Sequence, residues 1–532
     1  MNQLLNLVSK RIAQSEPWLF LIVALASLIP LFLLHYVGSL DGPKHLSASN
    51  MLGQLLMGND SFSNYFTLNP LYIGNVLGIY MLSLLNLVLP AWMAEKVFIA
   101  CYLLSFVYGF RYLIKSINDK STLFSLLIFP FTHTSLFMMG YYNFSLAIGL
   151  LFFALGYWIR HHRSFSRKSL AILGLLLLLT YLAHIFVFFI TIFLIALAGF
   201  ADFFISYRSN EKQSFKDFRI MAIQTIVAAL PSLILSFFYV IRIVDFQQSN
   251  SFREGDADKL ADLMSFRMLV GYDMKAELPL TSMLLYFFAS LTAFILIWRI
   301  ATWLKQPKDT VRPFWSSTDS WLVITLLFLF LYFVLPDGTD AAASVGMRML
   351  ILTSVLWALW IGLQRVPTLL GVFPLVGILL FGFQSRAIHL KYLKPLDQTI
   401  RQIEVFEKHL PANSLVVTMN FSKNWLMHYF HNYFGMEQAV VDLKSNACSP
   451  FMAFDWRNKK PEMLTDAAKE GGFTGYPGKD GKLQTATHVV IFEYRWYLKE
   501  ETLMEFRSVL DSFYVLSHVS DNQMLAIFER RN

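Results

Sequence analysis

Long apolar runs without a charged side chain dominate the first 385 residues. A membrane-spanning helix needs roughly 17–25 such residues, because each adds about 1.5 Å and the hydrocarbon core is about 30 Å thick. The uncharged runs cover residues 17–40, 121–159, 169–201, 220–241, 278–298, 320–336, 349–364 and 366–385. With two further apolar segments near 70–90 and 93–114, this pattern predicts a polytopic α-helical membrane protein with about 11–13 transmembrane helices.

The two longest runs exceed what one crossing needs, so we expect each to form a helical hairpin. Polar residues mark the expected turns, at 140–143 in the first run and at His184 in the second. Pro130 interrupts the first run, and a proline removes a helical hydrogen bond. We therefore expect segment 121–139 not to cross the membrane completely; a re-entrant stretch within 46–66 is the alternative.

Basic residues gather between the apolar runs, where cytoplasmic loops are enriched in Lys and Arg. The clusters lie at 160–168, 208–219 and 299–312, with Arg365 as a weaker case. This distribution predicts that the loops 38–69 and 245–279 face outside, as does everything after residue 385. Loop 245–279 interleaves apolar with basic residues, which is typical of an amphipathic helix at the membrane interface; a solvated helix that covers the end of the helix bundle is the alternative.

The composition changes after residue 385 to that of a soluble protein. Strand-like runs occur at 414–419, 487–492, 514–518 and 525–529, and helical runs at 395–409 and 498–510. Alternating strand and helix signals predict a small α/β domain. We therefore divide the chain into a transmembrane helical domain, 1–385, and an extracytoplasmic α/β domain, 386–532.

Composition supports the membrane class and weakens others. Of the 532 residues, 56% are hydrophobic and only 15% are charged. The net charge of +8 is the ordinary signal of basic loops beside membrane helices, so we expect no nucleic-acid partner. The two cysteines are too few for a disulfide framework.

The most informative polar cluster is Asp41-Gly42-Pro43-Lys44-His45, directly after the first apolar run. Charge at a bilayer boundary is costly unless it contacts water, substrate or metal. Gly42-Pro43 is expected to turn the chain and bring His45 close to Asp41. We predict Asp41 as the catalytic residue, a general base toward an acceptor, with Lys44 and His45 binding substrate. Asp41 and His45 are also candidate ligands of a divalent cation, Mg or Mn, and a merely helix-terminating aspartate is the alternative.

The expected hairpin turns carry a second set of polar side chains. His133, Tyr142 and Asn143 lie at the first, and His184 lies at the second. Lone histidines in apolar segments are more often structural groups than ligands. If the topology holds, however, these side chains converge with Asp41 at one membrane face, so we predict that they bind substrate.

A third polar group, Asp337, Asp340 and Arg348, lies between two apolar runs on the same predicted face. We predict that all three bind substrate. The planar guanidinium group can donate two parallel hydrogen bonds to the oxygens of a phosphate, so Arg348 is expected to hold a phosphate. An interfacial arginine whose charged end reaches the membrane surface is the alternative.

His428 and His431 are spaced three residues apart and could share one face of a helix over 424–434. No metal-binding motif with a glutamate accompanies them, so we interpret them as surface or groove residues.

Taken together, these features resemble the GT-C glycosyltransferases, which are integral membrane enzymes. The resemblance rests on a first helix followed by an outer loop with an acid (Leu40 to His45), a proline-broken segment with a polar tip (Phe129 to His133), many further helices and a C-terminal α/β domain. It implies transfer of a hexosyl or pentosyl group from a polyprenyl-phosphate-linked donor to an acceptor on the outer, periplasmic face. Catalysis would then fall to Asp41, and membrane lipid and the lipid-linked sugar would be the partners. We expect a bacterial inner (plasma) membrane location.

A secondary transporter or lipid flippase is the main alternative, and a non-catalytic scaffold for cell-envelope assembly is a third. Transporters typically place charged groups near the midplane and consist of repeated halves. Here the candidate charges cluster at one predicted face and no halves repeat, which favours the transferase. The sugar, the acceptor and the oligomeric state stay open.

Overall fold

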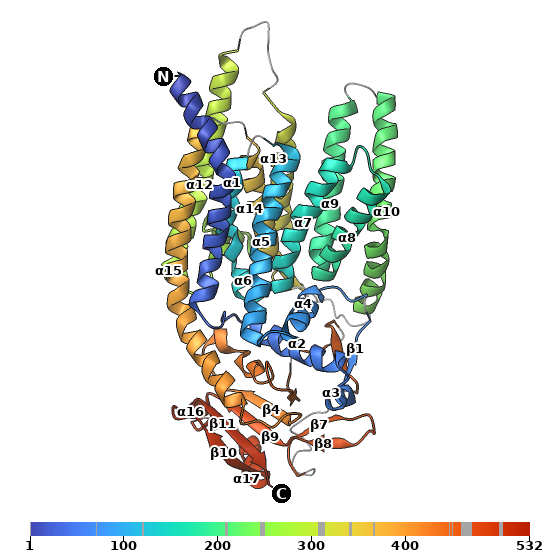
Figure 1. Cartoon of the computed structure of the whole chain (residues 1–532), viewed down its shortest axis with the longest axis vertical. Coiled ribbons are helices and arrows are strands. Elements are labelled where there is room, and N and C mark those ends of the chain that lie inside the picture. Colours follow the sequence, from blue (N-terminus) through green and yellow to red (C-terminus); the bar gives the residue numbers. More distant parts are fainter. Residues whose placement is uncertain are drawn as a thin grey trace. The chain divides into compact units, whose positions relative to one another are not determined.

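The structure is a computed structural model that describes residues 2–70, 72–119, 122–207, 211–244, 251–306, 314–339, 343–364, 368–445, 447–449, 451–458, 471–499 and 504–531. The chain divides into two compact units (Figure 1). The first unit contains residues 1–30 and 100–391, and the second contains residues 31–99 and 392–532. Each unit therefore combines segments that are far apart in the sequence.

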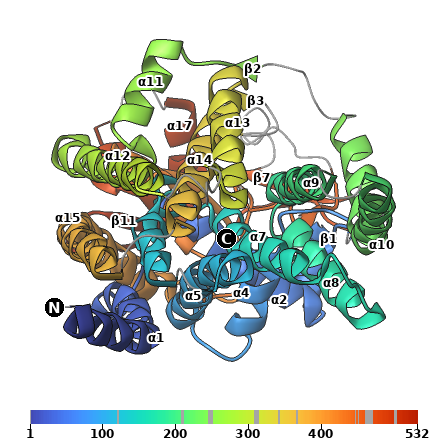
Figure 2. The same cartoon turned by 90° about the horizontal axis from the view of Figure 1, so that it is seen from above.

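Long apolar helices make up the first unit. They are α1 (Asn2–Leu33), α5 (Ala91–Ile117), α7 (Tyr142–His161), α8 (Arg167–Ala183), α9 (Ile185–Tyr207), α10 (Glu211–Val244), α12 (Met274–Leu304), α13 (Ser320–Val334), α14 (Val345–Gly362) and α15 (Thr368–Glu407), of which α1, α5 and α15 extend into the second unit. Helices α7, α8, α9 and α10 form one group, and α13 packs along α14 (Figure 2).

Eight helices of the described chain are long and apolar enough to cross a membrane: α1, α5, α7, α9, α10, α12, α13 and α14. Their outward-facing apolar side chains are unusually exposed; Phe237 on α10, for example, is 63% exposed. Such surfaces need lipid rather than water around them. The protein is therefore a predominantly helical integral membrane protein, as predicted. The 17 residues of α8 and the apolar start of α15 could add crossings, so the total of 11–13 helices stays a prediction.

The breaks expected in the two longest apolar runs are present. In the second run the backbone of His184 is extended (φ −162°, ψ 114°) and separates α8 from α9. In the first run, residues Thr122–His133 form the 3-10 helix η1, and the short helix α6 (Ser135–Met138) follows it. Neither η1 nor α6 is long enough to cross a membrane as an α-helix, which confirms the interruption predicted from Pro130.

The loop between α10 and α12 contains the predicted amphipathic helix as α11 (Asp256–Met264). Leu260 and Met264 on this helix are exposed, whereas Lys259 is fully buried. The strands β2 (Ser251–Phe252) and β3 (Gly338–Thr339) form a short antiparallel ladder beside it, and the 3-10 turn η2 (Arg267–Leu269) follows. Lys259 is buried because its ammonium group pairs with the carboxylate of Asp337, as described below.

The second unit is built around a five-stranded sheet. The strand order is β10 (Tyr514–Val519), β11 (Leu525–Arg530), β9 (His488–Phe492), β4 (Leu415–Asn420) and β5 (Val441–Asp442). Strand β4 is parallel to both β9 and β5, whereas β11 is antiparallel to its two neighbours. All four strands predicted in the tail are confirmed, with α17 (Met504–Phe513) covering part of the predicted second helix.

Residues 31–99 add further elements to this unit. They are α2 (Gly42–Leu56), α3 (Asp60–Tyr65), β1 (Phe66–Leu68) and α4 (Leu77–Asn86), and β1 pairs with β6 (Phe454–Trp456) of the tail. The carboxylate of Asp397 on α15 accepts the backbone N–H groups of His35 (3.1 Å) and Tyr36 (2.7 Å). The predicted division at residue 385 therefore differs from the observed units, because α15 continues through it and residues 31–99 pack with the tail.

Glu407, at the end of α15, predicts a pH dependence of stability. Its Oε1 accepts the N–H groups of Gly435 (2.7 Å) and Gln438 (3.0 Å). Burial nevertheless raises the pKa of Glu407 from 4.5 to about 8. Between these two values the folded state binds more protons than the unfolded state, so stability falls as the pH rises through this window.

We expect Glu407→Gln to flatten this part of the profile, because the amide cannot ionise. The measurement is the thermal unfolding midpoint of the purified protein between about pH 5 and pH 8. Glu505→Gln, at an exposed position in the first turn of α17, is the matched control and should keep the slope. An unchanged slope in the Glu407 variant would contradict the assignment.

Candidate functional site

Asp41 occupies the N-cap position of α2 in the second unit. Its side chain is 23% exposed, and Oδ1 lies 3.1 Å from Nζ of Lys44, one helical turn later. The predicted turn at Gly42-Pro43 is wrong, because both residues already belong to α2; proline fits the first turn of a helix, where its missing N–H is not needed. The same helical turn brings Lys44 and His45 beside Asp41, with the N–H of His45 donating to the carbonyl oxygen of Asp41 at 3.2 Å.

Lys44 has a second partner that the sequence did not indicate. Its Nζ lies 3.2 Å from the ring centroid of Tyr429, in the loop that follows β4. A cation over an aromatic face is stabilised by the ring quadrupole. The side-chain amide of Asn50 on α2 also donates to the carbonyl oxygens of Gly435 (2.9 Å) and Gln438 (3.0 Å), which fixes this loop against the helix. Asp41 and Lys44 thus share a site with the tail.

The predicted helix over 424–434 is absent, and the segment forms two 3-10 turns, η5 (Trp425–Met427) and η6 (Phe430–Tyr433). His428 is exposed, whereas His431 is buried. Burial lowers the pKa of His431 to about 4, with a contribution from the charge of Lys444. His431 is therefore neutral at physiological pH, and the two histidines do not present one charged face.

In the first unit, two predicted residues meet. The guanidinium Nη1 of Arg348 lies 3.1 Å from Nε2 of His184. Both side chains are buried, 8% and 7% exposed, and the rings of Tyr141, Phe144 and Phe186 surround the guanidinium group. Because arginine can only donate, His184 must accept through Nε2. Nε of Arg348 and Nδ1 of His184 have no hydrogen-bond partner within the described ranges.

Arg348 differs in this respect from two other arginines of the same unit, the buried Arg111 and the partly buried Arg299. Arg111 pairs with Glu16 (Nη2 to Oε2, 2.7 Å), and Arg299 pairs with Asp319 (Nη1 to Oδ1, 2.8 Å). Arg348 forms no ion pair with any described carboxylate. A buried charge without a counter-ion is costly, so the position suits an anionic ligand.

The remaining predicted residues of this unit lie near the start of α7. Tyr142 and Asn143 occupy its buried first turn. The rings of His133 and Tyr142 both pack against Phe137, with centroids 5.3 and 5.9 Å from it. His133 therefore lies near the α7 end. Asp41 belongs to the second unit, so its convergence with His133, His184 and Arg348 stays a prediction.

Asp337 is engaged in a buried ion pair. Its Oδ2 lies 3.0 Å from Nζ of Lys259 and accepts the N–H of Glu254 at 2.8 Å. Nζ of Lys259 also donates to the carbonyl oxygens of Tyr332 (3.0 Å) and Leu335 (2.9 Å). These contacts fasten α11 to the end of α13, which is a structural role. Asp340 lies outside the described residues.

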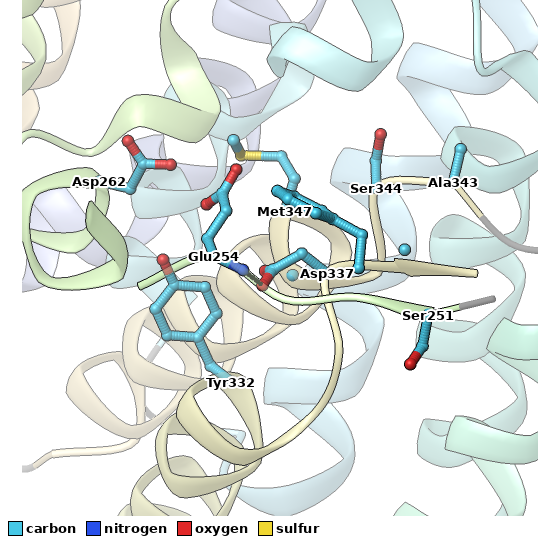
Figure 3. Close-up of a pocket in the computed structure, with 11 residues that line it drawn as sticks. Ser251, Glu254, Asp262, Tyr332, Asp337, Ala343, Ser344 and Met347 are labelled. Carbon is cyan, nitrogen blue, oxygen red and sulfur yellow. Dashed lines mark hydrogen bonds between the residues drawn. The ribbon is translucent and has the colours of Figure 1, made fainter. Parts of the chain in front are cut away.

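Asp337 also lines a cavity of about 510 Å³ (Figure 3). Glu254, Asp262 and Tyr332 lie on the same wall. Burial and the neighbouring carboxylate of Asp337 raise the pKa of Glu254, and burial raises that of Asp262. The cavity wall is acidic, so it is a poor place for a phosphate, and the substrate-binding role of Asp337 stays a prediction.

Removing one partner of this pair should destabilise the fold. In Lys259→Met the carboxylate of Asp337 stays buried without its counter-ion, a change that typically costs about 3–5 kcal/mol. The thermal midpoint of the purified protein measures the loss. Lys275→Met, at an exposed position in the first turn of α12, should leave the midpoint unchanged. Equal midpoints for the two variants would show that the ion pair contributes little.

The residues around Asp41 do not favour a metal ion. One carboxylate oxygen already faces the ammonium group of Lys44, which repels a second cation. Within the described ranges no group of three or more His, Cys, Asp or Glu side chains could hold a metal ion. We therefore derive no step through a divalent cation.

Comparison with known proteins gives limited information. No family model matches the sequence. No curated protein matches it. Among solved structures, the chain is similar to ArnT from Cupriavidus metallidurans in the apo state, over 97% of this chain and 98% of that one, with a TM-score of 0.37 and 11% sequence identity. A similarity this weak assigns neither a family nor an activity.

Proposed function

We propose that the protein is a membrane glycosyltransferase that moves a sugar from a polyprenyl-phosphate-linked donor to an acceptor on the outer face of the membrane. The observation that carries this proposal is the buried Arg348, which has no carboxylate partner within the described ranges although it lies among apolar helices. A lipid-linked phosphate is a ligand that combines an anionic head with an apolar chain, and it matches both features of this position.

In the proposed reaction, Asp41, Arg348 and Lys44 have different roles. An acceptor oxygen or nitrogen attacks the anomeric carbon of the donor sugar while Asp41 takes the proton of that nucleophile. The bond between the anomeric carbon and the phosphate oxygen breaks, and the polyprenyl phosphate leaves with the electron pair. Arg348 stabilises the charge that develops on this phosphate, and such preorganised donors are a major source of catalysis. Lys44 orients the carboxylate of Asp41 through their 3.1 Å contact.

The outer-face placement rests on the distribution of basic residues and on α11. This helix exposes Leu260 (50%) and Met264 (49%) in the loop predicted to face outside. An amphipathic helix of this kind lies in the membrane interface, where the phosphate head of the donor also lies. We infer that α11 guides the donor toward the helix bundle.

The experiment uses the full chain in proteoliposomes with a radiolabelled polyprenyl-phosphate sugar. A transferase consumes the donor and releases polyprenyl phosphate when an acceptor is supplied. A transporter or flippase would instead move the labelled donor across the bilayer chemically intact. If the labelled donor crosses the bilayer and is not converted with any acceptor tested, the protein is a transporter or flippase and the glycosyltransferase proposal is wrong.

A further inference from the structure

Four polar side chains of the first unit form a connected hydrogen-bonded series, and only His133 among them has a predicted role, in substrate binding. Oε2 of Glu277 on α12 lies 3.2 Å from Nε2 of His389 on α15. Nδ1 of His389 lies 3.2 Å from Nη1 of Arg386, and Nη2 of Arg386 lies 2.5 Å from Nδ1 of His133 at the end of η1. The sequence suggested only His133, because Glu277 lies on α12 and both Arg386 and His389 lie on α15, more than 140 positions away from His133 in the chain.

The guanidinium group fixes the protonation of both imidazole rings. Arginine has donors and no acceptor, so Nδ1 of His133 and Nδ1 of His389 must both accept. Each neutral ring then carries its proton on Nε2. For His389 that proton points at the carboxylate of Glu277. The Nε2–H of His133 has no hydrogen-bond partner within the described ranges and remains available as a donor.

Among the described residues, no carboxylate forms an ion pair with Arg386. Glu277 is the only acid among these four side chains, but it contacts His389 rather than Arg386. It also accepts the backbone N–H groups of Gly271 (2.8 Å), Tyr272 (2.7 Å) and Asp273 (2.7 Å). Arg386 has donors beyond those it gives to the two rings. Its Nη2 also lies 3.5 Å from the neutral hydroxyl oxygen Oγ1 of Thr132. Arg386 therefore resembles Arg348, which donates to His184 and forms no ion pair with any described carboxylate.

We propose that Arg386 and His133 form an oxyanion-binding pair, in which Arg386 holds His133 as a neutral Nε2–H donor and Glu277 with His389 holds Arg386. The ligand class is a phosphate monoester or another tetrahedral oxyanion. On the proposed function, on which this identification of the ligand rests, that oxyanion is the phosphate of the lipid carrier. Arg386 acts as a ligand-binding residue, whereas Glu277 and His389 are positioning residues.

The first test measures binding of farnesyl phosphate to the full chain in lipid nanodiscs, with farnesol and inorganic phosphate as separate ligands. We expect Arg386→Gln to weaken farnesyl phosphate binding at least about tenfold, which corresponds to 1.4 kcal/mol. Farnesol should bind the variant and the wild type equally. Arg163→Gln removes the same charge from an exposed position and should leave affinity within about twofold. Competition by inorganic phosphate would indicate a site for free phosphate as well as for the lipid.

The second test reads the imidazole directly. Nitrogen-15 NMR of histidine-labelled protein should place His133 in the Nε2–H form, with the resonance assigned by its loss in His133→Ala. In Arg386→Gln this resonance should change toward a mixture of forms. If Arg386→Gln does not fold, His133→Ala still tests the site through its farnesyl phosphate affinity. An Nδ1–H form in the wild type, or unchanged affinity in His133→Ala, would overturn the proposal.

The two proposals fail in different ways. Binding of farnesyl phosphate that depends on Arg386, without any sugar transfer, would refute the glycosyltransferase and keep the oxyanion site. Sugar transfer that is lost in Asp41→Asn but unaffected in Arg386→Gln would support the glycosyltransferase and refute the oxyanion site.

Discussion

Replacing Asp41 with asparagine is expected to lower the rate of sugar transfer by orders of magnitude while folding and donor binding are retained. The substitution keeps the size of the side chain at the N-cap of α2 but removes the group that accepts the proton of the acceptor. General-base catalysis typically contributes about 10²–10⁴-fold, so kcat should fall by that factor while the donor affinity stays constant. The measurement combines initial rates with an independent binding titration of the donor.

Asp60→Asn is the matched control for this variant. Asp60 is an exposed acid in the first turn of α3. It belongs to the same unit as Asp41 and to the same predicted outer segment, 38–69. The same chemical change there should leave both rate and affinity as in the wild type. Wild-type turnover in Asp41→Asn would remove Asp41 from the mechanism, and a simultaneous loss of donor binding would assign it to binding instead.

Replacing Arg348 with methionine is expected to lower activity without lowering stability. Methionine fills much of the apolar space among Tyr141, Phe144 and Phe186, and it removes a buried charge that has no counter-ion within the described ranges. The thermal midpoint should stay equal or rise. Activity should fall by about 10²–10³-fold, the usual effect of deleting one donor to a developing oxyanion.

Arg111→Met provides the contrast within the same unit. Arg111 is equally buried, but it pairs with Glu16, so its loss leaves a carboxylate unpaired. We expect the thermal midpoint of Arg111→Met to fall clearly, because the free energy of unfolding should decrease by about 3–5 kcal/mol. If Arg348→Met loses as much stability as Arg111→Met, Arg348 is a structural residue and the phosphate site fails.

Local sequence signals explain which parts of the structure could be predicted. The helical crossings, the interruption at His184 and the strands of the tail follow from apolar runs, polar breaks and alternation over a few residues. The contact of Lys44 with Tyr429 could not be predicted, because it joins a helix near one end of the chain to a loop near the other. The burial of Lys259 depends in the same way on a carboxylate from a distant segment.

Among the candidate residues, chemical type was a better guide than spacing. Arg348 and His184 were each singled out as polar groups in apolar surroundings, and they do contact each other. The spacing of His428 and His431 suggested a shared helical face, but the segment forms two 3-10 turns, and only His431 of the pair is buried. Nothing in the sequence singles out Arg386, because it stands where the composition changes to that of a soluble protein and a basic residue is common at such a boundary.

The pairing of β1 with β6 has a consequence for biogenesis. The register places Phe66 opposite Trp456. The strand near the beginning of the polypeptide therefore cannot pair until the ribosome has synthesised its partner near the end. Contacts of such long sequence separation form late and slowly. The tail made alone should therefore expose the surfaces that α2 and β1 cover, and premature termination of synthesis would leave an incomplete unit for the quality-control proteases of the cell to remove.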